Sequence, residues 1–131
     1  IHVINLEDFS VSYIPIGSNP RAIVLSPDNS MMYVTMNLSG KVASWDLVNN
    51  KAGKSVKTGK AARSLAISSD GTALFVVNFV SDTMSKVRTS DMKVLQNIKV
   101  CNEPIGITYD SPTSRTWVAC YGGSVKIFDN K

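Results

Sequence analysis

The sequence has very little histidine. His2 is the only one among 131 residues, and a Ser-His-Asp or Cys-His nucleophilic system needs a histidine as its base. A histidine metal cluster is equally hard to assemble, because a zinc site takes three or four ligands. Neither a Gly-x-x-x-x-Gly-Lys phosphate loop nor a Gly-x-Gly-x-x-Gly motif occurs. We therefore expect no catalytic residues, no metal and no cofactor.

Long apolar runs are also missing. None approaches the roughly 18 to 20 residues that a membrane-spanning helix needs, so we expect no transmembrane segment. The start at Ile1 has neither an initiator methionine nor the layout of a signal peptide. This beginning favours a processed or excised chain.

Cysteine is scarce, with Cys101 and Cys120 alone. Two cysteines are too few for a disulfide framework, and their spacing is wrong for a thiolate zinc site. Three interpretations stay open at this point: one disulfide, two buried thiols, or, least favoured, a metal site shared with His2.

The surplus of positive charge is small. Fourteen Lys and Arg stand against ten Asp and Glu, a net charge of +4, which is mild beside the dense basic clusters of nucleic-acid-binding proteins. We expect no nucleic-acid partner. One basic stretch runs from Lys51 to Arg63, and its glycines favour a strand over a helix. It is interpreted as a solvated outer edge that discourages aggregation, with an anionic contact as the alternative.

The apolar content is enough for a packed core. Hydrophobic residues make up 44% of the chain and charged residues 18%, which is too apolar for a disordered segment. The length suits one domain over 1–131.

The chain repeats itself with a period of about 42 residues, within the range of known repeat architectures. The motifs Pro20-Arg21-Ala22, Ala62-Arg63-Ser64 and Pro104-Ile105-Gly106 are in step, and so are Tyr33-Val34-Thr35, Phe75-Val76-Val77 and Trp117-Val118-Ala119. The repeat units cover about 11–52, 53–94 and 95–131, with 1–10 as the tail of a preceding unit. An internal repeat of this length predicts stacked structural units.

Each unit consists of short apolar runs rich in Val, Ile and aromatic residues, separated by turn clusters such as Ser26-Pro27-Asp28. Such runs predict strands, and no window has the spacing of an amphipathic helix. Asp28, Asp70 and Asp110 recur at the first turn of each unit, where we expect them to accept local N–H groups. Four strands in about 42 residues are typical of one blade of an all-β propeller, in which each blade buries both faces against its neighbours.

The first repeat resembles the YVTN-type β-propeller family. The likeness rests on Ile14 to Arg21, on Met32-Tyr33-Val34-Thr35-Met36-Asn37 and on Val42-Ala43-Ser44-Trp45-Asp46. The third copy has drifted from it. Trp45-Asp46 does not indicate a WD repeat, since the Gly-His dipeptide is missing. The resemblance implies a seven-bladed or similar propeller in extracytoplasmic or surface-layer proteins, with sugar-lactone hydrolases and electron-transfer propellers as distant relatives.

The family's strand order places the Pro-Arg-Ala strand innermost in its blade. Carried over to this chain, it implies two outer strands, two complete blades and three strands of another, at about 2–6 and 11–16, then 22–58 and 64–100, then 105–109, 115–120 and 124–129. Four blades of this repeat would need about 168 residues. We therefore expect an open segment of a larger, seven-bladed propeller, closed by blades of the same chain or of another.

That order also brings the loops after each second strand and before each innermost strand to one face, here called the rim. The candidate ligand-binding residues of the rim are Asn19, Arg21, Asn37, Lys60, Arg63, Asn78, Asn102, Glu103 and Tyr121. Cys101 and Cys120 would share this face within one blade, which makes a disulfide geometrically conceivable.

The rim side chains have alternative roles. Arg21 and Arg63 can bind a carboxylate or phosphate together, or tie blades through carbonyls or through Glu103. Asn37 and Asn78 can present amides to a ligand, or bond their own backbone.

These features favour a non-enzymatic extracytoplasmic scaffold that binds a protein, glycan or other ligand through the rim loops. The first alternative is an enzyme of the sugar-lactonase type, with Arg21, Arg63, Asn37 and Asn78 gripping the substrate. The second is an electron-transfer propeller that docks a redox partner.

Overall fold

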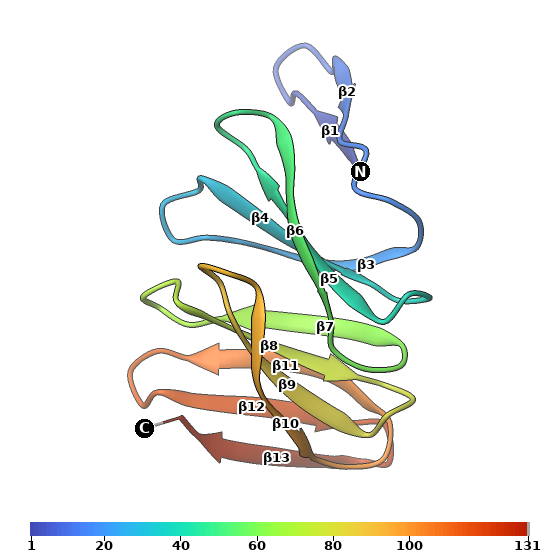
Figure 1. Ribbon diagram of the computed structural model, residues 1–131, viewed down its shortest axis with the longest axis vertical. Coiled ribbons are helices and arrows are strands. Elements are labelled where there is room, and N and C mark those ends of the chain that lie inside the picture. The colour runs from blue at the N-terminus through green and yellow to red at the C-terminus, as the bar shows by residue number, and fades with distance from the viewer. Residues whose placement is uncertain (131) are drawn as a thin grey trace.

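The structure is a computed structural model that describes residues 1–130, and it holds thirteen strands and no helix in that range (Figure 1). The short N-terminal hairpin consists of β1 (His2–Ile4) and β2 (Val11–Tyr13). The first complete blade consists of β3 (Pro20–Leu25), β4 (Met31–Met36), β5 (Lys41–Asp46) and β6 (Lys51–Lys57). The second consists of β7 (Ala62–Ile67), β8 (Ala73–Asn78), β9 (Thr83–Arg88) and β10 (Lys93–Lys99). The third, partial blade consists of β11 (Pro104–Asp110), β12 (Arg115–Cys120) and β13 (Ser124–Asp129).

Every sheet is an antiparallel meander in chain order, with two, four, four and three strands. The sheets follow one another along the long axis of the molecule, from β1–β2 at the top of Figure 1 to β11–β13 at the bottom. First strands meet across the blade boundaries, since β7 contacts both β3 and β11. The predicted all-β architecture of two complete and two partial blades is confirmed.

The N-terminal hairpin is shorter than predicted. Its strands were expected over 2–6 and 11–16, but they end at Ile4 and Tyr13. At the end of the first strand a turn takes up the difference, because the Phe9 N–H donates to the Asn5 carbonyl at 2.9 Å and the Asn5 N–H donates to the Ser10 carbonyl at 2.9 Å. Phe9 adopts a left-handed backbone with φ of 57° to close that turn.

The core lies between the sheets in three layers, because successive side chains of a strand point to opposite faces. Val34 of β4 packs towards the N-terminal hairpin, in a cluster with Ile14 and Trp45. Its neighbour Tyr33 packs towards the second blade, in a cluster with Val76. On the second blade, Phe75 packs in turn in a cluster with Val118 of the third blade.

The second blade shows how stacking between blades buries both faces of a sheet. All six residues of β8 are buried, because this sheet has a neighbour on each face. Residues of the third blade that point away from the second blade remain exposed, as Trp117 does at 38%. Burying one large apolar side chain stabilises a fold by roughly 1.5–3 kcal/mol, so each blade depends on its neighbours.

At the first turns, Asp28 and Asp70 accept local N–H groups as expected, whereas Asp110 accepts a hydroxyl group. The Asp28 carboxylate accepts hydrogen bonds from the Ser26 hydroxyl at 2.6 Å and from the Ser30 N–H at 3.1 Å. Asp70 makes both bonds again in the next repeat, with Ser68 at 2.6 Å and Thr72 at 3.0 Å. In the third blade, the Asp110 carboxylate accepts a hydrogen bond from the Thr113 hydroxyl.

The basic stretch begins along β6, the outer strand of the first blade. The lysines of this strand, Lys51, Lys54 and Lys57, are exposed, as the interpretation of a solvated outer edge requires.

Candidate functional site

The rim is built from the same backbone unit three times. Asn19, Ala61 and Glu103 occupy the equivalent position just before the first strand of each blade, and they have left-handed φ angles of 55°, 56° and 50°. Their carbonyl groups accept hydrogen bonds at 3.0 Å from the N–H groups of Asn37, Phe79 and Tyr121 in the same order. The loop before each first strand is therefore held against the end of the second strand. This is the arrangement of the rim that the sequence predicted.

A cleft opens on the rim between the second and third blades. It has a volume of about 490 Å³. It is lined by Phe79, Val80, Asp82, Asn102, Glu103, Tyr121 and Gly122. Three of the predicted ligand-binding residues, Asn102, Glu103 and Tyr121, meet there. We call this feature the rim cleft.

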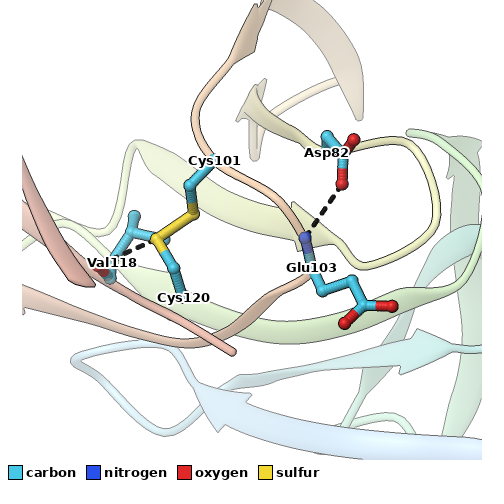
Figure 2. Close-up of a disulfide and its surroundings, with 5 residues drawn as sticks. All are labelled: Asp82, Cys101, Glu103, Val118 and Cys120. Carbon is cyan, nitrogen blue, oxygen red and sulfur yellow. Dashed lines mark hydrogen bonds between the residues drawn. A yellow bond between two sulfur atoms is a disulfide. The ribbon is translucent and has the colours of Figure 1, made fainter. Parts of the chain in front are cut away.

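A disulfide joins the two residues that precede Asn102 and Tyr121 of the rim cleft in the sequence. Cys101 and Cys120 are joined, with Cα atoms 6.1 Å apart (Figure 2). Cys101 precedes Asn102 and Cys120 precedes Tyr121, so the bond connects the two loops that carry these residues. Of the three interpretations of the cysteines, the structure has the disulfide. The two buried thiols and the metal site shared with His2 are both wrong.

The acidic groups of the rim cleft come from two turns. The Asp82 carboxylate accepts a hydrogen bond at 2.9 Å from the backbone N–H of Glu103, and Figure 2 shows the Glu103 side chain pointing away from Asp82 and from the disulfide. In the range 1–130 the one ion pair joins Arg88 to Asp91. The rim cleft therefore presents carboxylate oxygens that no lysine or arginine of the described chain neutralises.

The blade boundary one repeat earlier has different chemistry at the same positions. Asp82 corresponds there to Gly40, and Asn102 corresponds to Lys60. Lys60 is exposed, and its backbone N–H donates to the Ser81 hydroxyl at 2.7 Å. The rim is thus basic at one blade boundary and acidic at the next.

The two rim arginines have different surroundings. The Arg63 guanidinium lies 4.8 Å from the centre of the Phe79 ring, on the side chain that lines the rim cleft. This cation–π contact takes the place of the expected bonds from Arg63 to carbonyls or to Glu103. Arg21 is exposed at the start of β3. The exposed Asn19 lies just before β3, at the far end of the rim from the rim cleft.

The prediction that Asn78 binds a ligand is wrong. Its side chain is fully buried, and its amide is used up in hydrogen bonds to Thr58, Thr83 and Ser85. The position at the end of β8 was predicted correctly, but the side chain points into the blade boundary and not to the rim.

Asn37 also serves the blade boundary. It is half-buried, and its amide nitrogen donates to the Ala62 carbonyl of the second blade at 3.3 Å. The interpretation that asparagines at strand ends bond their own backbone is wrong for both residues, since each bonds across the blades.

Sequence reasoning did not find Phe79, Val80, Asp82 and Gly122. Only Asp82 could have been recognised from the sequence. It is an acidic residue at the repeat position that Gly40, which has no side chain, occupies one repeat earlier.

Two further properties of the described residues bear on function. No three His, Cys, Asp or Glu side chains within residues 1–130 are grouped as a metal site would need. No helix in that part of the chain has the length and hydropathy for crossing a membrane.

Comparisons with known proteins identify the fold. No family model matches the chain, and no curated protein matches it. Among solved structures, hydrazine synthase of Kuenenia stuttgartiensis is similar, with a TM-score of 0.82 and 26% identity over 91% of this chain and 36% of that one. The structure of the RRP9 WD40 repeats has a TM-score of 0.78 at 16% identity, over 86% of this chain and 36% of that one.

The dihydro-heme d1 dehydrogenase NirN is also similar, with a TM-score of 0.67 and 22% identity over 84% of this chain and 27% of that one. The chain thus spans about a third of the length of the structures that it matches. Together with the stacked blades, these likenesses show an open segment of a β-propeller. The likeness to the RRP9 repeats and to NirN, the two structures with the lower identities, shows the fold alone.

Proposed function

We propose that this chain is part of a YVTN-type extracytoplasmic β-propeller, a non-enzymatic scaffold that binds a protein or glycan ligand in the rim cleft. The observation that carries the proposal is the rim cleft itself. It combines two carboxylates, an amide and two aromatic rings on loops fixed by strands and by a disulfide. Binding residues on loops held by a rigid scaffold are the common arrangement for recognition.

The disulfide supports the extracytoplasmic part of the proposal. Structural disulfides form and persist in oxidising compartments and are rare in the cytosol. The YVTN resemblance of the first repeat points to the same location. Cell fractionation of the natural host, with an antibody against this chain, tests it. Recovery in the cytosolic fraction with both cysteines reduced would contradict it.

The chemistry of the rim cleft favours a protein ligand with a lysine or arginine side chain. The carboxylates of Asp82 and Glu103 attract a cation, and the exposed ring of Tyr121 offers a face for its methylene groups or its charge. A glycan remains the second class of ligand within this proposal, since the same carboxylates and the Asn102 amide can accept and donate hydrogen bonds to hydroxyl groups.

The binding experiment compares peptide arrays rich in Lys or Arg with matched neutral arrays, and adds an oligosaccharide array. We expect selective capture of basic peptides and a loss of about tenfold or more in affinity for Glu103→Gln and Tyr121→Ala. Lys60→Gln, a change at the equivalent position of the other blade boundary, is the matched control and should leave the affinity nearly unchanged. Equal binding by wild type, Glu103→Gln and Tyr121→Ala would overturn the assignment of the rim cleft.

A redox propeller is the second candidate function. The similarity to hydrazine synthase, the highest in identity of the three structures compared, favours it. The test is titration with haem, followed by absorption spectroscopy, and with a small c-type cytochrome, followed by calorimetry. Saturable binding of either probe that depends on Glu103 would favour a redox role over a scaffold.

A lactonase role has less support. Two of the four residues assigned to grip its substrate, Asn37 and Asn78, have amides engaged at the blade boundary. An assay with simple sugar lactones tests this role directly, and turnover would contradict the non-enzymatic scaffold.

A further inference from the structure

The two outer strands of the first blade pair different charges at their two ends. At the end away from the rim, Asp46 of β5 lies directly opposite Lys51 of β6. At the rim end, Lys41 of β5 lies directly opposite Lys57 of β6. Side chains directly opposite each other in an antiparallel pair have Cβ atoms about 4.5–5.5 Å apart, and like charges there are destabilising. Lys41 and Lys57 therefore repel each other.

The charges at the end away from the rim compensate each other. Hydrogen bonds from Asn49, and then the positive charge of Lys51, lower the pKa of the Asp46 carboxyl. The rim end has no such compensation. The one ion pair within residues 1–130 lies in the second blade, so no carboxylate of that range forms an ion pair with Lys41 or Lys57.

A third lysine lies beside this pair. The Thr58 N–H donates a hydrogen bond to the Gly40 carbonyl at 2.9 Å, which holds the segment after β6 against the start of β5. A Cβ atom on Gly40 would lie 3.7 Å from the Cα atom of Lys60. Lys60 is therefore close to the residue that precedes Lys41. The side chains of Lys41, Lys57 and Lys60, here called the lysine cluster, are all exposed.

The fold does not require positive charge at these positions. The backbone hydrogen bond that holds the segment after β6 recurs one repeat later, at the same length of 2.9 Å. Thr83 occupies there the position of Lys41. Asn102 occupies the position of Lys60. Since uncharged side chains serve the same backbone, packing does not account for the charges of the lysine cluster.

We propose that the lysine cluster binds a phosphate group, carried by a soluble phosphate ester or by the headgroup of an anionic lipid. Lysine is a compact positive charge on a flexible four-carbon stem and a common ligand of phosphate. Three such side chains from adjacent backbone positions can reach one phosphate. The site lies at the other blade boundary from the rim cleft and does not depend on the proposed function.

The charge of the lysine cluster favours phosphate over a carboxylate. A phosphate group carries up to two negative charges near neutral pH and has several strong acceptor oxygens. It can therefore accept hydrogen bonds from all three ammonium groups and offset the repulsion between Lys41 and Lys57. A carboxylate has one charge and leaves more of that repulsion uncompensated.

The first test titrates the 131-residue chain with inorganic phosphate at constant ionic strength, followed by amide NMR spectra. We expect saturable shifts around the lysine cluster. Lys41→Gln and Lys60→Gln should each weaken phosphate binding about fivefold or more. The matched control is Lys51→Gln, the same substitution at the other end of β6, which should leave the affinity unchanged. Glu103→Gln in the rim cleft should also leave it unchanged.

Thermal unfolding gives a second readout that a structural role of the lysines would move in the opposite direction. Without phosphate and at low ionic strength, Lys57→Gln removes the repulsion with Lys41 and should raise the melting temperature by about one to four degrees. Lys51→Gln, which removes an attraction to Asp46, should not raise it. Phosphate should raise the melting temperature of the wild type more than that of Lys57→Gln.

Vesicles distinguish the two sources of the phosphate group. The chain is sedimented with phosphatidylcholine vesicles that contain or lack phosphatidic acid. Cosedimentation that needs the anionic lipid, and that is lost in the Lys41→Gln, Lys60→Gln double variant, assigns the site to a lipid headgroup. Phosphate binding without cosedimentation assigns it to a soluble phosphate ester.

Three results would overturn the proposal. The first is an equal affinity for phosphate in the wild type, Lys41→Gln and Lys60→Gln. The second is an equal loss of affinity in Lys51→Gln, which would show attraction by net charge alone. The third is a lower melting temperature of Lys57→Gln without phosphate, which would show that the lysine cluster stabilises the fold itself.

Discussion

The Thr58 hydroxyl donates a hydrogen bond to the Asn78 side-chain oxygen at 2.9 Å, and this bond joins the end of the first blade to the end of β8 in the second. The Asn78 amide nitrogen donates in turn to the Thr83 and Ser85 hydroxyls, at 3.0 and 3.1 Å. Asn78 is fully buried, and a buried polar group contributes to stability when all its hydrogen bonds are made. The hydrogen bonds of Asn78 therefore stabilise the blade boundary together with the apolar packing.

Replacing Asn78 by alanine should lower the free energy of unfolding by about 1–3 kcal/mol, because the Thr58 and Ser85 hydroxyls lose a buried partner. Urea denaturation followed by circular dichroism measures the change. The matched control is Asn102→Ala, an exposed asparagine of the rim, which should change stability by less than about 0.5 kcal/mol. Equal effects of the two substitutions would show that the hydrogen bonds of Asn78 contribute nothing to the free energy of unfolding.

Two glycines in equivalent turns should respond differently to alanine. Gly40 and Gly123 both have left-handed backbones, with φ of 64° and 86°, so each substitution costs roughly 1–2 kcal/mol in backbone strain. A Cβ at Gly40 would lie 2.1 Å from the Gly59 carbonyl oxygen of the next blade boundary, whereas a Cβ at Gly123 meets nothing within 4 Å. Gly40→Ala should therefore destabilise the fold clearly more than Gly123→Ala in thermal unfolding. The reverse order would contradict the stacking of the blades.

Reduction of the disulfide should lower the free energy of unfolding by about 3 kcal/mol, the amount expected for closing a loop of this size. The sequence separation of Cys101 and Cys120 is 19. Denaturation with and without a phosphine reductant measures the difference. The Cys101→Ala, Cys120→Ala double variant should match the reduced protein and be insensitive to the reductant. A ligand of the rim cleft should bind more weakly to both, since the loops that carry Asn102 and Tyr121 are no longer linked.

Stability should fall in acid through the turn aspartates. Hydrogen bonds from the Ser26 hydroxyl, and then from Ser30, lower the pKa of Asp28 from its ordinary value of 3.8 to about 2. Between those two values the unfolded chain binds a proton that the folded chain does not, so lowering the pH favours unfolding. The contribution of Asp28 is complete above pH 3.8 and is lost as the pH falls towards 2.

Asp28→Asn removes this titration and is the variant to compare. The stability difference between wild type and Asp28→Asn should shrink as the pH falls through that window, when measured by urea denaturation. Hydrogen bonds from Ser68 and Thr72 lower the pKa of Asp70 in the same way, so the double variant with Asp70→Asn should show a flatter acid profile still. A constant difference at every pH would refute the role of these carboxylates.

Much of the fold was predictable because the residue types at the turns and strands recur from one repeat to the next. Turn residues such as Asp28 and Asp70 recur in step and are recognised by type, and the short apolar runs between the turns predict strands. The rim followed from strand order, and it brought Asn102, Glu103 and Tyr121 together. The direction of a single side chain did not follow, as Asn78 shows, since its fate depends on the hydroxyls of Thr58 and Ser85 from other strands.

The sequence by itself determined the strands, the turns and the length of the repeat unit, because these depend on contacts between near neighbours in the chain. Only the tertiary structure decided the disulfide and the acidic rim cleft. Each of these arises where two blades meet, between residues that are distant in sequence. The residue pattern of one strand does not predict which side chains it contacts across that boundary.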